Sequence, residues 1–181
     1  GRISEIQQHE FEREIIIKIG TREGTYLLVT ELFGDGNIIL VNPQGKILYA
    51  LTYKRMRDRN IIRGENYKYA PSSGKNPLHL SQTDFDEIKN YEHLEIVRAL
   101  TKLLSIGGLY AEETLLRAKI DKNTPCEALT KQQIDTIFTQ TQTLISKTIN
   151  REFEPSIVVD EKGEWIDVTP LPLKRYANLT L

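Results

Sequence analysis

The stretch LLSIGGLYAEETLLRAKIDKNTPCEALTKQQIDTIFTQTQTLISKTI, residues 103–149, says most about the fold. Apolar residues at helical spacing predict a helix over about residues 91–105 that runs into Gly107-Gly108, and a second helix that starts at once. A long third helix is expected from Thr130, because Thr130-x-x-Gln133 has the pattern of a capping box. The segment therefore predicts three helices, with a glycine turn between the first two.

The Gly107-Gly108 turn is the first candidate site. Glycines at a helix start leave the backbone N–H groups around Gly108 to Tyr110 open, and the helix dipole favours an anion there. A phosphate is therefore the expected ligand of Gly107, Gly108 and Tyr110. The alternative is structural: Gly107 ends the preceding helix in a left-handed cap, and Gly108 loosens the turn.

The composition is that of an ordinary soluble protein. Of 181 residues, 39% are hydrophobic and 27% are charged, and the net charge is −1. A protein that coats nucleic acid by bulk charge would be basic, so any nucleic-acid site here must be local. The sequence has no run of about 18 apolar residues and no signal peptide, so we expect a cytoplasmic protein without a membrane partner.

Sequence motifs for metal binding and catalysis are missing. Cys126 is the one cysteine, which excludes an internal disulfide and a multi-cysteine zinc site. His9, His79 and His93 are scattered, and no HExxH pattern occurs. Since GxSxG and a P-loop are also absent, no catalytic residue, metal or cofactor is expected.

The first 70 residues read as short strands separated by Gly, Asp, Asn and Pro turns about every 8–12 residues. Strands are expected at 14–19, 25–33, 37–41 and 47–52, with a strand-like pattern also at 2–7. This spacing predicts an antiparallel meander folded into a sandwich or barrel. The hydrophobic period becomes helical at Ser81, where Ser81-x-x-Asp84 caps a short helix, and returns to strands after Pro155.

The expected architecture is α+β, with three segments. Residues 1–70 form an antiparallel, sandwich-like strand block, and residues 81–150 form a helical block. Residues 151–181 supply closing strands: a hairpin over residues 156–168 that rejoins the first block, and one more strand over residues 171–181.

The densest positive charge lies in YKRMRDRNIIRGENYKY, residues 53–69, with six Lys or Arg against two acids and three interleaved tyrosines. Arginines offer forked donors to phosphate, and tyrosines stack on bases. The candidate phosphate contacts are Lys54, Arg55, Arg57, Arg59 and Arg63. The alternative is a solvated loop in which Asp58 pairs with Arg57 or Arg59.

A second charged cluster is HEFERE, residues 9–14. Alternation along a strand would place Glu12 and Glu14 on one side and Phe11 and Arg13 on the other. From spacing alone, this is an edge strand protected by charge.

Three ordered motifs resemble the NFACT N-terminal domain family, which includes bacterial RqcH, eukaryotic NEMF and the fibronectin-binding protein A-like proteins. They are ELFGDGNIIL at 31–40, MRDRNIIRGENYKY at 56–69 and SIGGLYAEETLLRA at 105–118. The last also resembles the helix–two-turn–helix of formamidopyrimidine-DNA glycosylases, whose fold of a strand sandwich plus helices the family shares. In those enzymes the turn matched by Gly107-Gly108 holds a DNA phosphate. The family's opening stretch has no match here, so the chain looks like a fragment that lacks the start of the domain.

The resemblance implies ribosome-associated quality control. Family members bind a separated large ribosomal subunit that holds peptidyl-tRNA, and promote template-free extension of the stalled chain, usually with alanine. They position peptidyl- and aminoacyl-tRNA while the ribosome makes the bond, so the resemblance implies a factor and not an enzyme. The family's Asp-Arg pair needed for tailing matches Glu12 and Arg13, with Glu in place of the usual Asp.

Two alternative functions follow from the same resemblances. A fibronectin-binding surface adhesin predicts a secretion signal or anchor, and this sequence shows neither. A DNA glycosylase-like, DNA-binding protein predicts an N-terminal Pro-Glu and a four-cysteine zinc finger, which are also missing. Leu109 stands where the glycosylase turn normally carries Asn.

Overall fold

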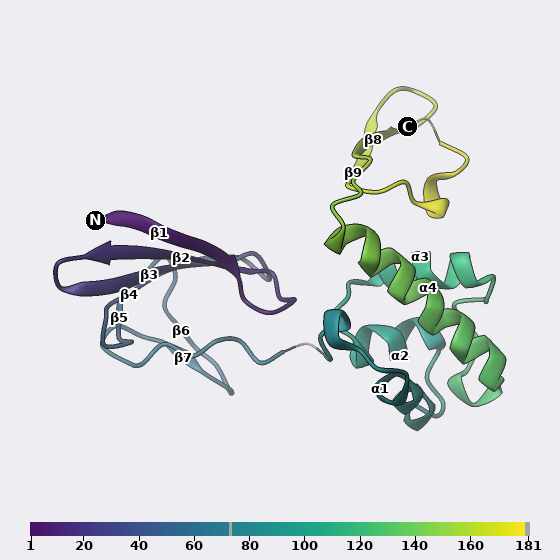
Figure 1. Ribbon diagram of the computed structural model, residues 1–181, viewed down its shortest axis with the longest axis horizontal. Coiled ribbons are helices and arrows are strands. Elements are labelled where there is room, and N and C mark those ends of the chain that lie inside the picture. Colours follow the sequence, from purple (N-terminus) through teal and green to yellow (C-terminus); the bar gives the residue numbers. More distant parts are fainter. Residues whose placement is uncertain (73, 180–181) are drawn as a thin grey trace. The chain divides into compact units, whose positions relative to one another are not determined.

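The computed structural model describes residues 1–72 and 74–179. The chain forms two compact units, Gly1–Ser73 and Gly74–Leu181. The first unit is built from strands, and the second is built from helices and a short hairpin (Figure 1). The mixed fold with antiparallel strands and a helical block is therefore as the sequence predicted.

The first unit contains a five-stranded antiparallel meander whose strands follow one another in sequence order. The strands are β1 (Arg2–Gln8), β2 (Glu14–Thr21), β3 (Gly24–Glu31), β4 (Asn37–Val41) and β5 (Ile47–Ala50). Gly36 and Gly45 have φ of 74° and 77°, which the turns before β4 and β5 require and which side chains disfavour. The meander predicted from the turn spacing is confirmed.

The segment after the meander contributes to the core of this unit. It contains the short antiparallel pair β6 (Lys54–Arg55) and β7 (Asn60–Ile61). Ile61 joins Val29, Ile39 and Ile47 in one buried cluster, and Tyr67 packs against it. The basic segment is thus part of the fold as well as a source of charge.

The second unit has a helical core. Its helices are α1 (Gln82–Asp86), α2 (Ile96–Leu103), α3 (Gly108–Ala118) and α4 (Lys131–Ile149), with the short 3-10 turns η1 (Pro77–His79), η2 (Glu87–Asn90) and η3 (Cys126–Ala128). Both predicted capping boxes are present, at Ser81 and Thr130. The expected helix over residues 91–105 is shorter, because His93 adopts a left-handed φ of 62° before α2 begins.

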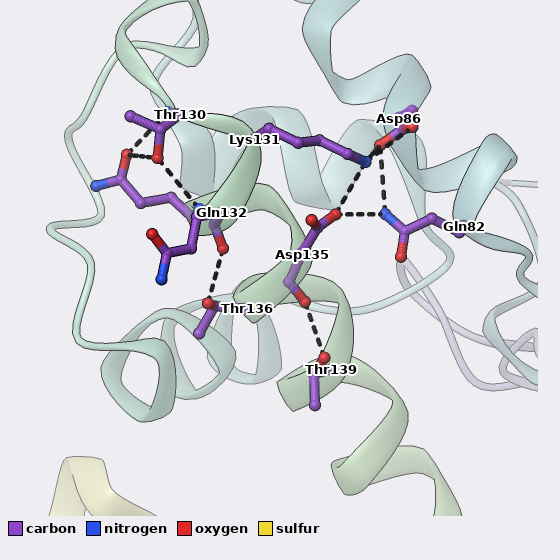
Figure 2. A network of polar contacts seen from close by, with 9 residues as sticks. Gln82, Asp86, Thr130, Lys131, Gln132, Asp135, Thr136 and Thr139 are labelled. Carbon is purple, nitrogen blue, oxygen red and sulfur yellow. Dashed lines mark hydrogen bonds and ion pairs between the residues drawn. The ribbon is translucent and has the colours of Figure 1, made fainter.

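An exposed polar network ties α1 to α4 (Figure 2). The Lys131 ammonium lies 2.9 Å from carboxylate oxygens of both Asp86 and Asp135. The Gln82 amide donates to Asp135 at 3.1 Å. All these groups reach solvent, so water screens their charges and the network orients the helices more than it stabilises them.

The C-terminal hairpin packs on the helices of the second unit. Strands β8 (Ser156–Val159) and β9 (Trp165–Thr169) form a two-stranded sheet of their own and belong to the second unit. Among the described residues the hairpin pairs with no strand of the first block, and its return to that block stays a prediction. Val158 packs with Leu109 and Tyr110 of α3, and this apolar contact holds the hairpin to the helices. Trp165 remains 78% exposed.

The segment after the hairpin forms η4 (Lys174–Tyr176) where one more strand was expected. A fully buried carboxylate, Glu113 of α3, fixes this segment. Its oxygens accept hydrogen bonds from Arg117 Nε (2.6 Å) and from the backbone N–H groups of Lys174 (3.0 Å) and Arg175 (3.2 Å). The last residues of the expected strand, 180–181, lie outside the described residues.

Candidate nucleic-acid interface

Glu12 and Arg13 lie in a turn between β1 and β2, formed by residues 9–13 and called here the 9–13 turn. The His9 N–H donates to the Glu14 carbonyl (2.9 Å), and the Glu12 N–H donates to the His9 carbonyl (3.0 Å). The predicted alternation along an edge strand is wrong here, because Glu10 adopts a left-handed φ of 49° and the strand stops. Glu12 and Arg13 are presented by a closed hairpin turn.

The 9–13 turn is anchored by the end of the first unit. Ser72 Oγ donates to Glu12 Oε1 at 2.8 Å. The His9 ring stacks on the Tyr69 ring, with centroids 3.8 Å apart and planes 9° from parallel. Contacts on Glu12 and His9 therefore fix the turn on either side of its tip.

The Arg13 side chain is exposed, and no salt bridge within the described part of the chain engages its guanidinium. Arg13 borders an open depression of about 390 Å³. The lining mixes polar and apolar side chains: Ile6, Gln7, Gln8, Glu12, Arg13, Glu14, Ile15 and Leu32. A guanidinium at such a rim can pair with a phosphate while apolar lining contacts a base or ribose.

Glu14 joins the turn to a buried group of side chains, the acid–tyrosine cluster of Glu14, Glu31, Arg59 and Tyr67. Glu14 of β2 and Glu31 of β3 face each other across the sheet and are 0% and 6% exposed. The Tyr67 hydroxyl donates to Glu14 Oε1 at 2.6 Å and lies 3.3 Å from Glu31 Oε1. Arg59 Nη1 lies 2.7 Å from Glu31 Oε1.

Burial dominates the electrostatics of this cluster. Burial raises the pKa of Glu14, the Tyr67 hydrogen bond opposes this rise, and the nearby Glu31 charge adds to it. Burial and the bond to Glu14 also raise the pKa of Tyr67, so its hydroxyl remains a donor at neutral pH. Glu14 Oε2 is buried and has no hydrogen-bond partner among the described residues.

The predicted role of Arg59 in phosphate binding is wrong, because its side chain is only 4% exposed. Arg59 pairs with Glu31, donates to the Lys68 carbonyl at 3.0 Å and lies over the Phe33 ring. The alternative is also not observed, since Asp58 makes no salt bridge within the described residues. The opposed acids Glu14 and Glu31 explain why a cation is buried there.

The other basic residues of this segment reach the surface. Lys54 pairs with Asp35 at 2.9 Å, and the Arg63 guanidinium lies over the Tyr49 ring, 5.0 Å from its centroid. Arg55 and Arg57 are exposed. The predicted phosphate contacts of these four basic residues stay predictions. Arg55 and Arg57 are best placed to make such contacts.

The Gly107-Gly108 turn is in the second unit. Gly107 has φ of −73° and is the residue before α3, so the predicted alternative of a left-handed cap is wrong. A Cβ built on either glycine meets nothing within 4 Å. Among the described residues no acceptor is found for the N–H groups of Gly108 and Leu109, whereas the Tyr110 N–H donates to the Gly107 carbonyl at 3.1 Å. The Tyr110 N–H is therefore already engaged, and the expected anion site is left with the N–H groups of Gly108 and Leu109.

The chain matches the family of NFACT N-terminal and middle domains over residues 1–180. It belongs to the NFACT family. It is 37% identical over 184 residues to a protein named archaeal Rqc2 homolog aRqcH from Methanocaldococcus jannaschii. That alignment covers 99% of the chain and 27% of the relative, so the chain spans about a quarter of the length of this relative.

Solved structures of other proteins resemble this chain in fold. A fibrinogen-binding protein from Staphylococcus aureus has a TM-score of 0.70 at 21% identity, covering 96% of this chain and 63% of the other. The N-terminal part of a fibronectin/fibrinogen-binding protein from Streptococcus suis gives 0.63 at 21% identity, with coverages of 96% and 60%. MutM (Fpg) from Thermus thermophilus gives 0.52 at 18% identity, with coverages of 82% and 60%. At these identities the likeness concerns the fold alone.

The NFACT motifs contain residues whose importance the sequence reasoning missed. Glu31 ends β3 in the first motif, and Tyr67 comes from the second. Asn37 of the first motif is buried and exchanges hydrogen bonds with the Thr52 backbone at 2.9 and 3.0 Å. A sequence signal existed for the acids: a hairpin with its turn at residues 21–24 places Glu14 opposite Glu31, and two opposed acids require a cation.

No helix in the described part of the chain is long and apolar enough to cross a membrane.

Proposed function

We propose that this chain is the tRNA- and large-ribosomal-subunit-binding module of a ribosome-associated quality-control factor. The factor promotes template-free alanine tailing of stalled chains. Family membership and the 37% identity to a protein named archaeal Rqc2 homolog support this assignment. The observation that carries it is the exposed Arg13, which stands in an anchored turn at the rim of a depression.

In this proposal the chain positions tRNA and does not catalyse. Arg13 pairs with a tRNA phosphate or stacks on a base, since a guanidinium makes both contacts. Ser72 holds the Glu12 carboxylate, which orients the turn or accepts a hydrogen bond from the tRNA. The bound species are peptidyl- and aminoacyl-tRNA in the cytoplasm. The ribosome forms the peptide bond, so the chain needs no metal or cofactor of its own.

Further contacts to RNA come from each unit separately. In the first unit, Arg55, Arg57 and Arg63 contact phosphates, with Lys54 partly neutralised by Asp35. In the second unit, the N–H groups at the start of α3 donate to a phosphate oxygen at Gly108, where no side chain obstructs it. These contacts are made to phosphates, so they do not depend on base sequence, and those made by Lys and Arg weaken as salt rises.

The decisive experiment measures alanine-tail formation on isolated large subunits that carry peptidyl-tRNA, using the protein in its natural length. Arg13→Ala should abolish tailing while subunit binding and stability stay within about 0.5 kcal/mol of wild type. Arg22→Ala is the matched control, because Arg22 is also an exposed arginine beside a hairpin turn of the same sheet. Normal tailing by Arg13→Ala would overturn the assignment. Fibronectin binding without tRNA binding would favour the adhesin alternative.

Variants of Glu12 test the second member of the pair in the same assay. Glu12→Asp should retain or improve tailing, because it restores the residue implied by the family resemblance. Glu12→Ala should lose tailing. Equal activity of all three forms would limit the site to Arg13.

The salt dependence of tRNA affinity tests the basic segment. A double Arg55/Arg57→Ala variant should lower the slope of log affinity against log salt by about two units if both side chains contact phosphate. Lys54→Ala should change the slope less, because Asp35 already engages that ammonium. An unchanged slope in the double variant would assign these arginines to the solvated surface.

A further inference from the structure

We propose that Tyr67 is a positioning residue for the 9–13 turn, so that its hydroxyl holds Glu12 and Arg13 in the geometry that meets tRNA. The proposal rests on the proposed function for its tRNA readout. Its structural half, which concerns the order of the turn, can be measured without RNA.

Tyr67 reaches the turn by two routes. Its hydroxyl donates to Glu14 Oε1 at 2.6 Å, and Glu14 directly follows Arg13 in the chain. Its ring meets the Tyr69 ring edge-on, with centroids 5.4 Å apart, and Tyr69 stacks on His9. The two routes enter the 9–13 turn at opposite ends, so one side chain constrains both ends of the loop that carries Arg13.

The cluster also makes the Tyr67 hydroxyl a directed donor. Arg59 Nη1 lies 3.4 Å from the Tyr67 oxygen and 2.7 Å from Glu31 Oε1. Because Arg59 neutralises Glu31 and can donate to the phenol oxygen, the single phenolic proton is left for Glu14. Arg59 and Glu31 thus set the direction in which Tyr67 donates.

Stability alone does not account for this arrangement. Glu14 is fully buried, and its Oε2 has no hydrogen-bond partner among the described residues. A buried carboxyl group satisfied on one oxygen is less favourable than an apolar side chain of similar size. A role in positioning the exposed Arg13 explains why a polar cluster is buried here, which packing alone does not explain.

The test compares Tyr67→Phe with Tyr26→Phe. Tyr26 makes the same kind of bond, from its hydroxyl to Glu23 at 2.8 Å, at the other end of the β2–β3 hairpin. Amide hydrogen exchange should accelerate at His9 and Glu12 in Tyr67→Phe and remain unchanged there in Tyr26→Phe. Affinity for an unfractionated tRNA pool should fall roughly tenfold in Tyr67→Phe alone. Unchanged exchange at both amides would overturn the proposal.

A double variant separates positioning from general destabilisation. If Tyr67 acts through Arg13, Tyr67→Phe should weaken tRNA binding in the wild-type background and add nothing in the Arg13→Ala background. If the losses of tRNA affinity from the two substitutions add in the double variant, Tyr67 does not act through Arg13. Faster exchange in Tyr67→Phe together with normal tRNA binding by Arg13→Ala would support the positioning of the turn and overturn the proposed contact of Arg13 with tRNA.

Substitutions at Glu14 keep the proposal testable if Tyr67→Phe does not fold. Glu14→Gln retains an oxygen that accepts from Tyr67, so exchange at His9 and Glu12 should match wild type. Glu14→Met has similar size and no acceptor, so it should show faster exchange and weaker tRNA binding. Wild-type exchange in Glu14→Met would overturn the role of this hydrogen bond.

Discussion

Glu14 in the strand unit and Glu113 in the helical unit are both fully buried, yet their oxygens are satisfied differently. Glu113 accepts from Arg117 and from two backbone N–H groups, so both of its oxygens are engaged. Glu14 accepts from Tyr67 on one oxygen, and its other oxygen has no partner among the described residues. Two equally buried carboxyl groups therefore stand in unequal electrostatic environments.

The difference indicates which unit carries the more specialised site. Glu113 ties the chain after β9 to α3, a structural task that full satisfaction suits. Glu14 lies one residue from the exposed Arg13, and its incomplete satisfaction lowers stability at the place where the proposed function needs a fixed turn. Strained or incompletely paired groups are commonly found at functional sites.

The largest expected effect contrasts the two acids directly. Glu113→Gln should lower the free energy of unfolding of the helical unit by about 3 kcal/mol, because it leaves the partly buried Arg117 without its charge partner. Glu14→Gln should cost little or stabilise, since its amide oxygen still accepts from Tyr67. Hydrogen-exchange mass spectrometry under urea reports each unit separately, and Glu112→Gln is the control on α3. Equal losses at positions 14 and 113 would break the comparison.

The next effect concerns the cation of the strand unit. Arg59→Met should destabilise that unit by about 3 kcal/mol, because Glu31 is then buried without its partner. A double Glu31→Leu/Arg59→Met variant should lose less than Arg59→Met alone, since no buried charge is orphaned. If the double variant is the less stable of the two in urea unfolding, the Arg59–Glu31 pair contributes net stability. The strand unit would then resemble the helical unit, where Glu113 stabilises the fold.

A smaller effect depends on pH. The folded state raises the pKa of Glu14, so its contribution to stability is present below the ordinary value of 4.5 and is lost as pH rises through the folded pKa. Glu14→Gln removes this dependence, so the variant should gain on wild type as pH rises. Urea titrations of the strand unit at several pH values would measure the difference, and a constant difference would mean that Glu14 is not the titrating group.

The smallest effect sharpens the separation of the units. Lys119 ends α3 with a left-handed φ of 58°, and its N–H donates to the Leu115 and Leu116 carbonyls. Lys119→Gly should stabilise the helical unit by about 0.5 kcal/mol, because relief of the left-handed strain exceeds the entropy lost on ordering glycine. Exchange in the strand unit should not respond. A matching shift in both units would show that they unfold together.

Local signals were enough to predict much of the fold. The meander follows from turns such as the one containing Gly36, and the start of α4 follows from Thr130 with Gln133, because each depends on residues close in sequence. The packing of the last hairpin on α3 could not be predicted, because it depends on Val158 meeting Leu109, residues far apart in the chain. Sequence periodicity has no access to such a contact.

The site was predicted only in part, for similar reasons. Alternation in HEFERE suggested a strand, but the left-handed Glu10 converts the segment to a turn, which composition does not reveal. Arg59 is one basic residue among several in its segment, and its burial depends on the distant Glu31. The glycine signals were also unequal: a Cβ at Gly74 would lie 2.6 Å from the Leu104 carbonyl carbon, whereas Gly107 and Gly108 are unobstructed. The space around a glycine depends on tertiary structure, so the sequence does not indicate which glycines are obstructed.

Trp165 is the one tryptophan of the chain, and its 78% exposure has a spectroscopic consequence. An indole already in water emits in the folded protein much as it does after unfolding, so tryptophan fluorescence should be nearly silent when either core melts. It should instead respond to anything that covers the outer side of β9. The residue is thus a poor probe of folding and a built-in reporter of docking on the C-terminal hairpin.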